Sequence, residues 1–312
     1  MTQSREKRIA VLGTACGYSV KQLVPFLASV RQAVPDADVF LFVGQKSLKQ
    51  AAALQKICPN CWLVVPSDSG LRECLRRIPR GRKVLCQTLL WVAKSLSPAV
   101  GPSRMMTAAL GVAVARYVWY LEWINSSIGS QYSNVLIADT RDVLFQSDPS
   151  VKCPGDKLFC GLEPVLIKDC PANSAWIRQC YGQAELERFG DKPVLCSGFS
   201  GGSRDAVINY LEAMAAEILA CGHKIALNGG YDQGIHNKII HQGCLSGKVT
   251  FCHWKEDVIA TMHYVRSNHL MADSERNLRT GDGRIVSIVH QYDRHPSLRA
   301  FVEQKYKGET ST

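Results

Sequence analysis

The residues most able to do chemistry are two aspartates that lie close together in the sequence. Asp139-Thr140-Arg141-Asp142 directly follows the apolar run 135–138, which is typical of a short strand buried on both faces. In open α/β sheets, ligands collect at the carboxyl ends of strands, and two acids there call for a compensating cation. A divalent metal ion bound by both carboxylates would compensate their charge. The alternative is that Asp139 caps the next turn and Asp142 pairs with Arg141.

A second polar cluster links a glycine-rich segment to the start of a helix. The segment 197–202 reads SGFSGG, and its glycines would let the backbone approach a ligand closely. The segment 228–233 reads NGGYDQ and opens a helical pattern that runs to Ile240. Asp232 and Gln233 therefore fall in the first turn of a helix, where polar side chains face a cleft.

A third cluster, HQYDRH at 290–295, follows an expected strand at 284–289. His290 could ligate a metal or simply be hydrogen-bonded in place. Arg116 lies in the apolar part of an expected helix, and a guanidinium is costly to bury alone. We expect Arg116 to face Asp139, Asp142 or a bound phosphate, unless it reaches the surface. Arg116 and Arg294 could hold phosphates as bidentate donors.

The elements that must position these clusters alternate between strand and helix. Strands at 8–13, 38–43 and 61–65 are separated by helical patterns at 19–34 and 45–57, which predicts a parallel sheet with right-handed crossovers. No G-x-G-x-x-G or G-K-S/T motif follows the first strand, so a nucleotide must be held in another way. Further expected strands are 135–138, 157–162, 193–196 and 284–289, and further helices are 103–128 (capped by Ser103), 172–189 and 204–221.

Composition places the chain among folded proteins with a substantial core. The 312 residues are 46% hydrophobic, and we expect one domain with a nucleotide-binding half at 1–149 and a second half at 150–312. Thirteen cysteines without an export signal predict reduced thiols and a cytoplasmic protein without a transmembrane segment. Cys58 and Cys61 form a C-x-x-C that precedes a strand, which disfavours a redox or zinc role.

The formal net charge of +10 indicates an anionic partner, and the charge is uneven. The basic segment runs from Arg72 to Lys83, and Glu73 is the only acid in it. Such a segment suits phosphates, an acidic membrane face or another polyanion, or it forms a solvated loop. Nucleic acid is not expected because the segment lacks interleaved aromatic residues and no nucleic-acid module accompanies it. The cations of this segment are Arg72, Arg76, Arg77, Arg80, Arg82 and Lys83.

Taken in order, these motifs resemble those of the GT-A family of nucleotide-diphospho-sugar transferases. The likeness covers a βαβ opening, a D-x-D-type motif ending a central strand, an SG-rich segment, a D-Q element opening a helix and a late histidine. It implies a GT-A-like α/β fold with a mostly parallel central sheet, a Rossmann-like N-terminal half and helices on both faces. The resemblance also implies Mn²⁺ or Mg²⁺ bridging the two phosphates of a sugar nucleotide.

The resemblance assigns a role to each cluster. The metal ligands are Asp142, His290 and Asp139, although D-x-x-D in place of D-x-D leaves open which acid touches the ion. Asp142 is favoured as ligand, with Asp139 on the ribose or on a metal-bound water. The resemblance places Asp232 and Gln233 at the donor sugar or the acceptor hydroxyl, with Asp232 nearest the anomeric carbon, and favours a retaining transferase. The donor would further contact Arg116, Asp139, Arg141, Gly201, Gly202 and Arg294.

Several other classes of protein compete with this prediction. Gly198-Phe199-Ser200-Gly201-Gly202 matches a G-x-S-x-G nucleophile elbow, and Ser200, Asp232 and His290 follow in α/β-hydrolase order, as in a serine esterase. A serine esterase of this kind would give no role to the aspartates at 139 and 142. A non-catalytic binding protein and a nucleotidyltransferase are weaker alternatives, the latter because residues 13–17 lack its basic signature. The sequence does not identify the acceptor, which could be a glycan, a lipid-linked molecule or a protein. The basic segment predicts peripheral membrane contact.

Overall fold

The computed structural model describes residues 8–78, 80–96, 104–153, 155–227, 229–245, 247–266 and 269–310, without the side chains of 93–96 and 310. Ser103, predicted to cap a helix, and Asn228 of the second cluster lie outside the described residues.

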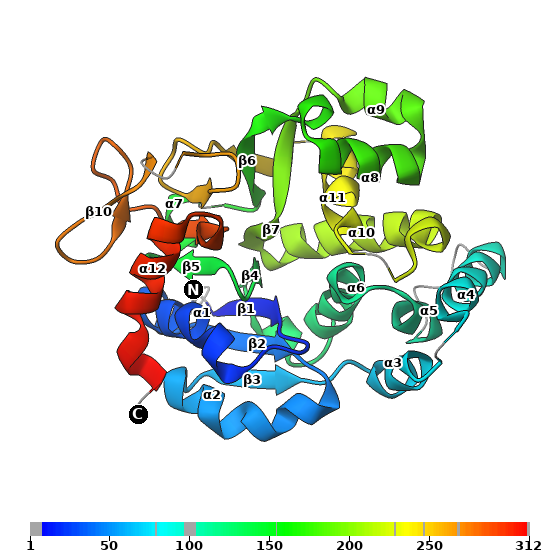
Figure 1. Cartoon of the computed structure of the whole chain (residues 1–312), viewed down its shortest axis with the longest axis horizontal. Coiled ribbons are helices and arrows are strands. Elements are labelled where there is room, and N and C mark those ends of the chain that lie inside the picture. Colours follow the sequence, from blue (N-terminus) through cyan, green and yellow to red (C-terminus); the bar gives the residue numbers. More distant parts are fainter. Residues whose placement is uncertain are drawn as a thin grey trace, which may run out of the picture.

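A seven-stranded sheet runs through the molecule in the order β3-β2-β1-β4-β7-β6-β8 (Figure 1). β7 is antiparallel to both of its neighbours, β4 and β6, and the other four pairings are parallel. The prediction of a mixed α/β fold with a mostly parallel central sheet is therefore confirmed. The strands are β1 (Ile9–Thr14), β2 (Asp38–Phe42), β3 (Cys61–Val64), β4 (Asn134–Asp139), β6 (Leu158–Leu166), β7 (Pro193–Ser203) and β8 (Val249–Cys252).

Helices cover both faces of this sheet, as expected. Side chains alternate along β1, so Val11 packs on one face with α1 (Val20–Ala33) and α2 (Ala51–Ile57). Leu12 packs on the other face, where the core includes residues of α5, α6, α10 and α11. These four helices are Arg104–Ala109, Val112–Ile124, Arg204–Ile225 and Tyr231–His241.

A second, three-stranded sheet lies on the α1 face, in the order β5-β12-β9. Its strands are β5 (Val143–Phe145), β12 (Ile288–His290) and β9 (Ile259–Thr261). β12 is antiparallel to β5, with His290 opposite Val143. The sequence pattern did not predict β5, and the strand expected at 284–289 is shorter and ends one residue later. This pairing places His290 close to the carboxyl end of β4.

The helix predicted at 103–128 is instead two helices, α5 and α6, separated at Leu110 and Gly111. Tertiary hydrogen bonds satisfy the backbone at the break: Arg72 donates to the carbonyl of Leu110, and the N–H of Gly111 donates to the carbonyl of Ala226. The helix predicted at 172–189 is also divided, into α8 (Pro171–Tyr181) and α9 (Gln183–Phe189). Gly182 lies between them at φ +96°.

The strand expected at 193–196 extends further than predicted, so that the segment SGFSGG is part of β7. The remaining elements of the described chain are short helices and strands around these sheets, together with α3, α4 and α12. They are η1 (Gln45–Gln50), α3 (Ser69–Arg76), α4 (Arg82–Leu96), η2 (Gly129–Gln131), α7 (Pro149–Lys152), η3 (Ile167–Asp169), β10 (Met271–Ala272), β11 (Leu278–Arg279), η5 (Tyr292–Arg294), α12 (Pro296–Lys305) and η6 (Lys307–Thr310).

The thirteen cysteines are all free, in agreement with the expected reduced thiols. Cys58 and Cys61 are buried, and burial raises the pKa of the Cys58 thiol to about 11, which is opposite to the shift of a reactive redox cysteine. None of the helices in the described parts of the chain has both the length and the apolar character needed to span a bilayer.

Candidate metal centre and adjoining cavity

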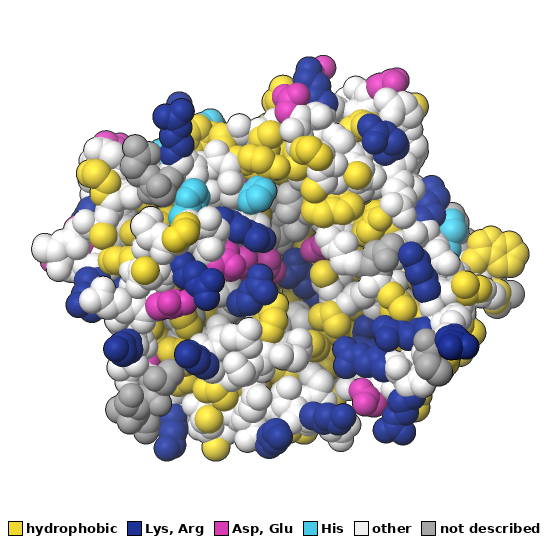
Figure 2. Space-filling model, in the orientation of Figure 1, with side chains coloured by type: hydrophobic (Ala, Val, Ile, Leu, Met, Phe, Trp, Pro, Cys, Tyr) yellow, Lys and Arg dark blue, Asp and Glu magenta, His cyan; other side chains and the backbone are white. Residues whose placement is uncertain are grey.

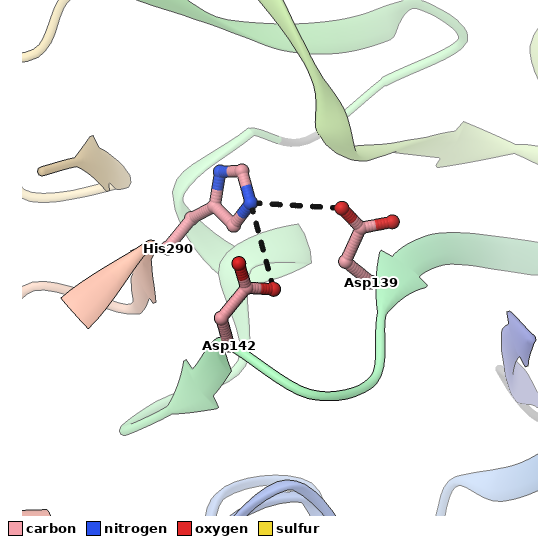
Figure 3. A group of neighbouring side chains, drawn as sticks. All are labelled: Asp139, Asp142 and His290. Carbon is pink, nitrogen blue, oxygen red and sulfur yellow. Dashed lines mark ion pairs between the residues drawn. The ribbon is translucent and has the colours of Figure 1, made fainter. Parts of the chain in front are cut away.

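Asp139, Asp142 and His290 lie together at the carboxyl end of the central strand β4. Asp139 is the last residue of β4, Asp142 immediately precedes β5, and His290 ends β12. Their side chains point toward one another (Figure 3). His290 Nε2 lies 3.7 Å from Asp139 Oδ2 and 3.9 Å from Asp142 Oδ1. One polar atom from each side chain lies within 4.8 Å of the others.

This group fits a divalent metal ion. Bonds of about 2.0–2.6 Å to carboxylate oxygen and imidazole nitrogen allow a single ion to reach ligand atoms at these separations. His290 Nε2 is buried and has no hydrogen-bond partner among the described residues, which is costly for a polar atom unless an ion or a water completes it. The other ring nitrogen, Nδ1, lies 3.0 Å from Cys196 Sγ. Such a contact fixes the orientation of a metal-binding imidazole.

Gly198 on β7 leaves the space that the centre needs. A Cβ atom at this position would lie within 3.0 Å of the His290 ring and 3.0 Å from Asp139 Oδ2. The backbone of β7 is held between β4 and β6 and has little freedom to retreat. Glycine is therefore required here by close approach rather than by a special backbone angle.

Arg116, only 6% exposed, joins the centre to the second polar cluster. Its Nη1 forms an ion pair with Asp139 Oδ1, and its Nη2 lies 3.0 Å from Asp232 Oδ2. The expectation that this buried arginine faces Asp139 is confirmed. Because Oδ1 of Asp139 takes the guanidinium, Oδ2 is left facing His290. Asp232 itself lies in the first turn of α11, as predicted.

Burial and charge shift the pKa values of these groups in different directions. Burial by itself would raise the pKa of Asp139, but Arg116 and His290 outweigh it and hold that pKa below its usual value. Burial raises the pKa of Asp142, against the opposing effect of His290, and raises that of Asp232 against Arg116. Burial lowers the pKa of His290, but Cys196 and the two aspartates raise it overall. A metal ion would take the place of that proton.

A cavity of about 440 Å³ adjoins the centre. The guanidinium-bearing side chains of Arg141 and Arg294 are half-exposed at its wall, each 3.9 Å from Asp293. Figure 2 shows acidic and basic side chains gathered around a hollow near the middle of the face it displays. The residues lining the cavity are Thr14, Cys16, Tyr18, Val112, Ala113, Arg116, Asp139, Thr140, Arg141, Asp142, Trp176, Ser197, Gly230, Asp232, Gln233, Gln291 and Arg294.

Gly201 and Gly202 are not brought to this cavity. Both are buried in β7, where Gly201 packs against Leu136 and Phe159, and Gly202 pairs with Val135 near the start of β4. The structure therefore gives them a packing role in the sheet, and the glycine that lies beside the centre is Gly198.

The serine of the G-x-S-x-G motif also lies within β7, without the strand-to-helix turn that a nucleophile elbow requires. Ser200 is buried, and its hydroxyl lies 3.7 Å from Cys160 Sγ. Among the described residues no hydrogen bond joins Ser200, Asp232 and His290 to one another. The esterase alternative is thus not supported by the positions of its three residues.

Glu163 on β6 is a buried acid near the centre that sequence reasoning did not identify. Burial raises its pKa to about 7, partly offset by His290, and its carboxylate lies 3.5 Å from Gln233 Nε2. An acid within an otherwise apolar strand was the only signal for it. Cys196, inside the apolar run that begins β7, gave none.

Comparison of the sequence with protein-family models and with curated proteins finds no match. The assignment of a function therefore depends on the side chains that the fold assembles at the end of β4. These are three candidate metal ligands, arginines at the wall of the cavity and the Asp232–Gln233 pair.

Proposed function

We propose that the protein is a metal-dependent glycosyltransferase that moves a sugar from a nucleoside-diphosphate sugar to an acceptor, with retention of configuration. The observation that carries this proposal is the Asp139, Asp142 and His290 group at the end of β4, beside a cavity with exposed arginines. The GT-A resemblance of the motifs, in the same order along the chain, adds to it. The cavity volume is in the range of small-molecule sites, about 300–1,000 Å³.

The charges of the site suit a diphosphate. Arg141 and Arg294 present half-exposed guanidinium groups at the cavity, able to bind phosphate oxygens in a bidentate manner. Arg116 is already engaged by two carboxylates, so we assign it to holding Asp139 and Asp232 in place. A bound Mn²⁺ or Mg²⁺ would neutralise charge on the departing diphosphate.

Asp232 and Gln233 are the candidates for contact with the transferred sugar. Both line the cavity from the first turn of α11, and Arg116 fixes the Asp232 carboxylate. Gly230 allows this turn, since it adopts φ +87° and an added Cβ would meet the ring of Trp176. We place Asp232 nearest the anomeric carbon and Gln233 beside it as a hydrogen-bonding group.

Calorimetric binding of nucleoside diphosphates tests the proposal. With a panel of UDP, GDP and ADP, we expect one to bind the wild-type protein about tenfold more tightly with Mn²⁺ than with a chelator. Asp142→Asn should abolish this difference. Asp191→Asn, a carboxylate exposed on the surface and outside the cavity, serves as the matched control. Equal affinity with and without metal in the wild type would remove the basis of the proposal.

A further inference from the structure

The helix α4 carries apolar residues on the side that faces solvent as well as on the side that faces the core. Cys86 and Leu90 point inward and are buried. Val84 and Trp91, seven residues apart and so on one side of the helix, are 65% and 59% exposed. Leu85 and Val92, at the same spacing, are also exposed, as are Leu71 of α3 and Met105 of α5.

Exposed cations lie on the same helices and in the segment between α3 and α4. Glu73 is the only acid between Ser69 and Gly111. The structure removes Arg72 from the predicted basic cluster because that side chain is buried, paired with Asp68 at 3.0 Å and hydrogen-bonded to Leu110. In Figure 2, Lys and Arg side chains gather where Figure 1 draws α3 and α5, with hydrophobic side chains at the edge near α4. The exposed cations of the region are Arg76, Arg77, Arg80, Lys83 and Arg104.

We propose that this surface, formed by the exposed residues of α3, α4 and α5 and by Arg77 and Arg80, docks on an anionic lipid membrane. We call it the α3–α5 surface. Its large apolar side chains would enter the boundary between headgroups and acyl chains, and its cations would contact lipid phosphates. Trp91 is of the type that concentrates at this boundary. The proposal is independent of the glycosyltransferase assignment.

Charge and residue type favour a membrane over other occupants. In a symmetric dimer through this surface, each copy would place its exposed cations near the same cations of the other. A nucleic acid would match the charge, but Trp91 is a single aromatic residue among the aliphatic side chains Val84, Leu85 and Val92, whereas binding of a single strand uses successive stacking residues. An anionic bilayer supplies both the negative charge and the apolar layer that the surface requires.

Sedimentation of the full chain with lipid vesicles tests the proposal. We expect binding to phosphatidylcholine vesicles containing about one third phosphatidylserine, little binding to phosphatidylcholine alone, and weakening as salt increases. The double variants Val84→Glu/Trp91→Glu and Arg77→Glu/Arg80→Glu should each bind about tenfold more weakly. The matched controls, Val151→Glu for an exposed apolar residue and Lys56→Glu for an exposed cation, should bind as the wild type does.

Three results would overturn the proposal. The first is absence of wild-type binding to the phosphatidylserine vesicles at low salt. The second is binding that both double variants retain in full, because it would come from another surface. The third is a concentration-dependent dimer or an oligonucleotide complex that the double variants lose, in the absence of vesicle binding. Because the charge variant leaves the apolar residues in place, a folding defect in Val84→Glu/Trp91→Glu does not remove the test.

Discussion

Arg116 determines how the carboxylates of the site are arranged. Its guanidinium pairs with Asp139 on one side and Asp232 on the other, and it is almost completely buried. A buried cation between two acids is stable only while both partners remain, because an isolated buried charge has lost its hydration without compensation. The same side chain thus orients a candidate metal ligand and the carboxylate we place nearest the sugar.

Arg116→Ala should lower the unfolding free energy by about 3 kcal/mol, because it leaves the buried Asp232 and the partly buried Asp139 without their cation. Chemical denaturation near neutral pH measures this loss of unfolding free energy. Asp232→Asn in the Arg116→Ala background should recover part of it, since a neutral amide replaces one unpaired charge. A single variant as stable as the wild type would contradict the importance of the pair.

The sequence was sufficient to predict that Arg116, if buried, faces an acid or a bound phosphate, since a guanidinium is costly to bury alone. It did not identify Asp232 as the second partner, because that contact depends on where α11 lies against α6. Contacts such as Cys196 with His290 are likewise tertiary and leave no local pattern.

The strand β7 illustrates how one glycine-rich segment serves two purposes. Gly198 makes room for the metal centre, whereas Gly201 makes room for Leu136 and Phe159 in the core. The sequence pattern ended the expected strand at residue 196, but a strand flanked on both sides by partners can hold glycines wherever neighbouring side chains need the space. Local composition alone does not show which glycine makes room for the metal centre and which makes room for the core.

Comparing Gly198→Ala with Gly201→Ala separates the two purposes. Gly198→Ala should weaken Mn²⁺ binding about tenfold or more, because the new methyl group displaces His290 from its position. Gly201→Ala should cost about 1–3 kcal/mol of stability through overpacking but keep its response to the ion. The measurement is the rise in melting temperature on titration with Mn²⁺, relative to each variant without metal. Wild-type Mn²⁺ affinity in Gly198→Ala would contradict the geometry.

The helices and strands with long, regular patterns were predictable, and the short or interrupted ones were not. β1, α1 and β2 follow their expected ranges because local periodicity and turn residues agree with the tertiary fold. β5 is three residues long and gains its identity only from pairing with β12. The break between α5 and α6 depends on hydrogen bonds from Arg72 and to Ala226, which lie far away in the sequence.

The molecule as a whole assembles its candidate site from distant parts of the chain. Asp139 comes from the large sheet, while Asp142 precedes β5 and His290 ends β12 in the small one. The polar clusters could be predicted to meet because each was expected at a strand end or at the first turn of a helix. Their relative orientation could not, because the antiparallel β7 and the second sheet set it.

The buried Glu163 predicts how global stability depends on pH. Its pKa is about 7 in the folded protein, raised by burial from an ordinary value near 4.5. Between these pH values the folded state holds a proton that the unfolded state has lost, so stability falls as pH rises through this window and levels off above it. A shift of this size corresponds to about 3 kcal/mol.

Glu163→Gln should remove this contribution, since the amide stays neutral at every pH. Relative to the wild type, the variant should therefore gain about 2–3 kcal/mol of unfolding free energy between pH 5 and pH 8. Chemical denaturation in the presence of a chelator measures the difference, in which contributions from other buried acids such as Asp232 cancel. Glu187→Gln, on the surface, is the control and should follow the wild type. A constant difference between Glu163→Gln and wild type across this range would show that Glu163 is already ionised in the folded protein.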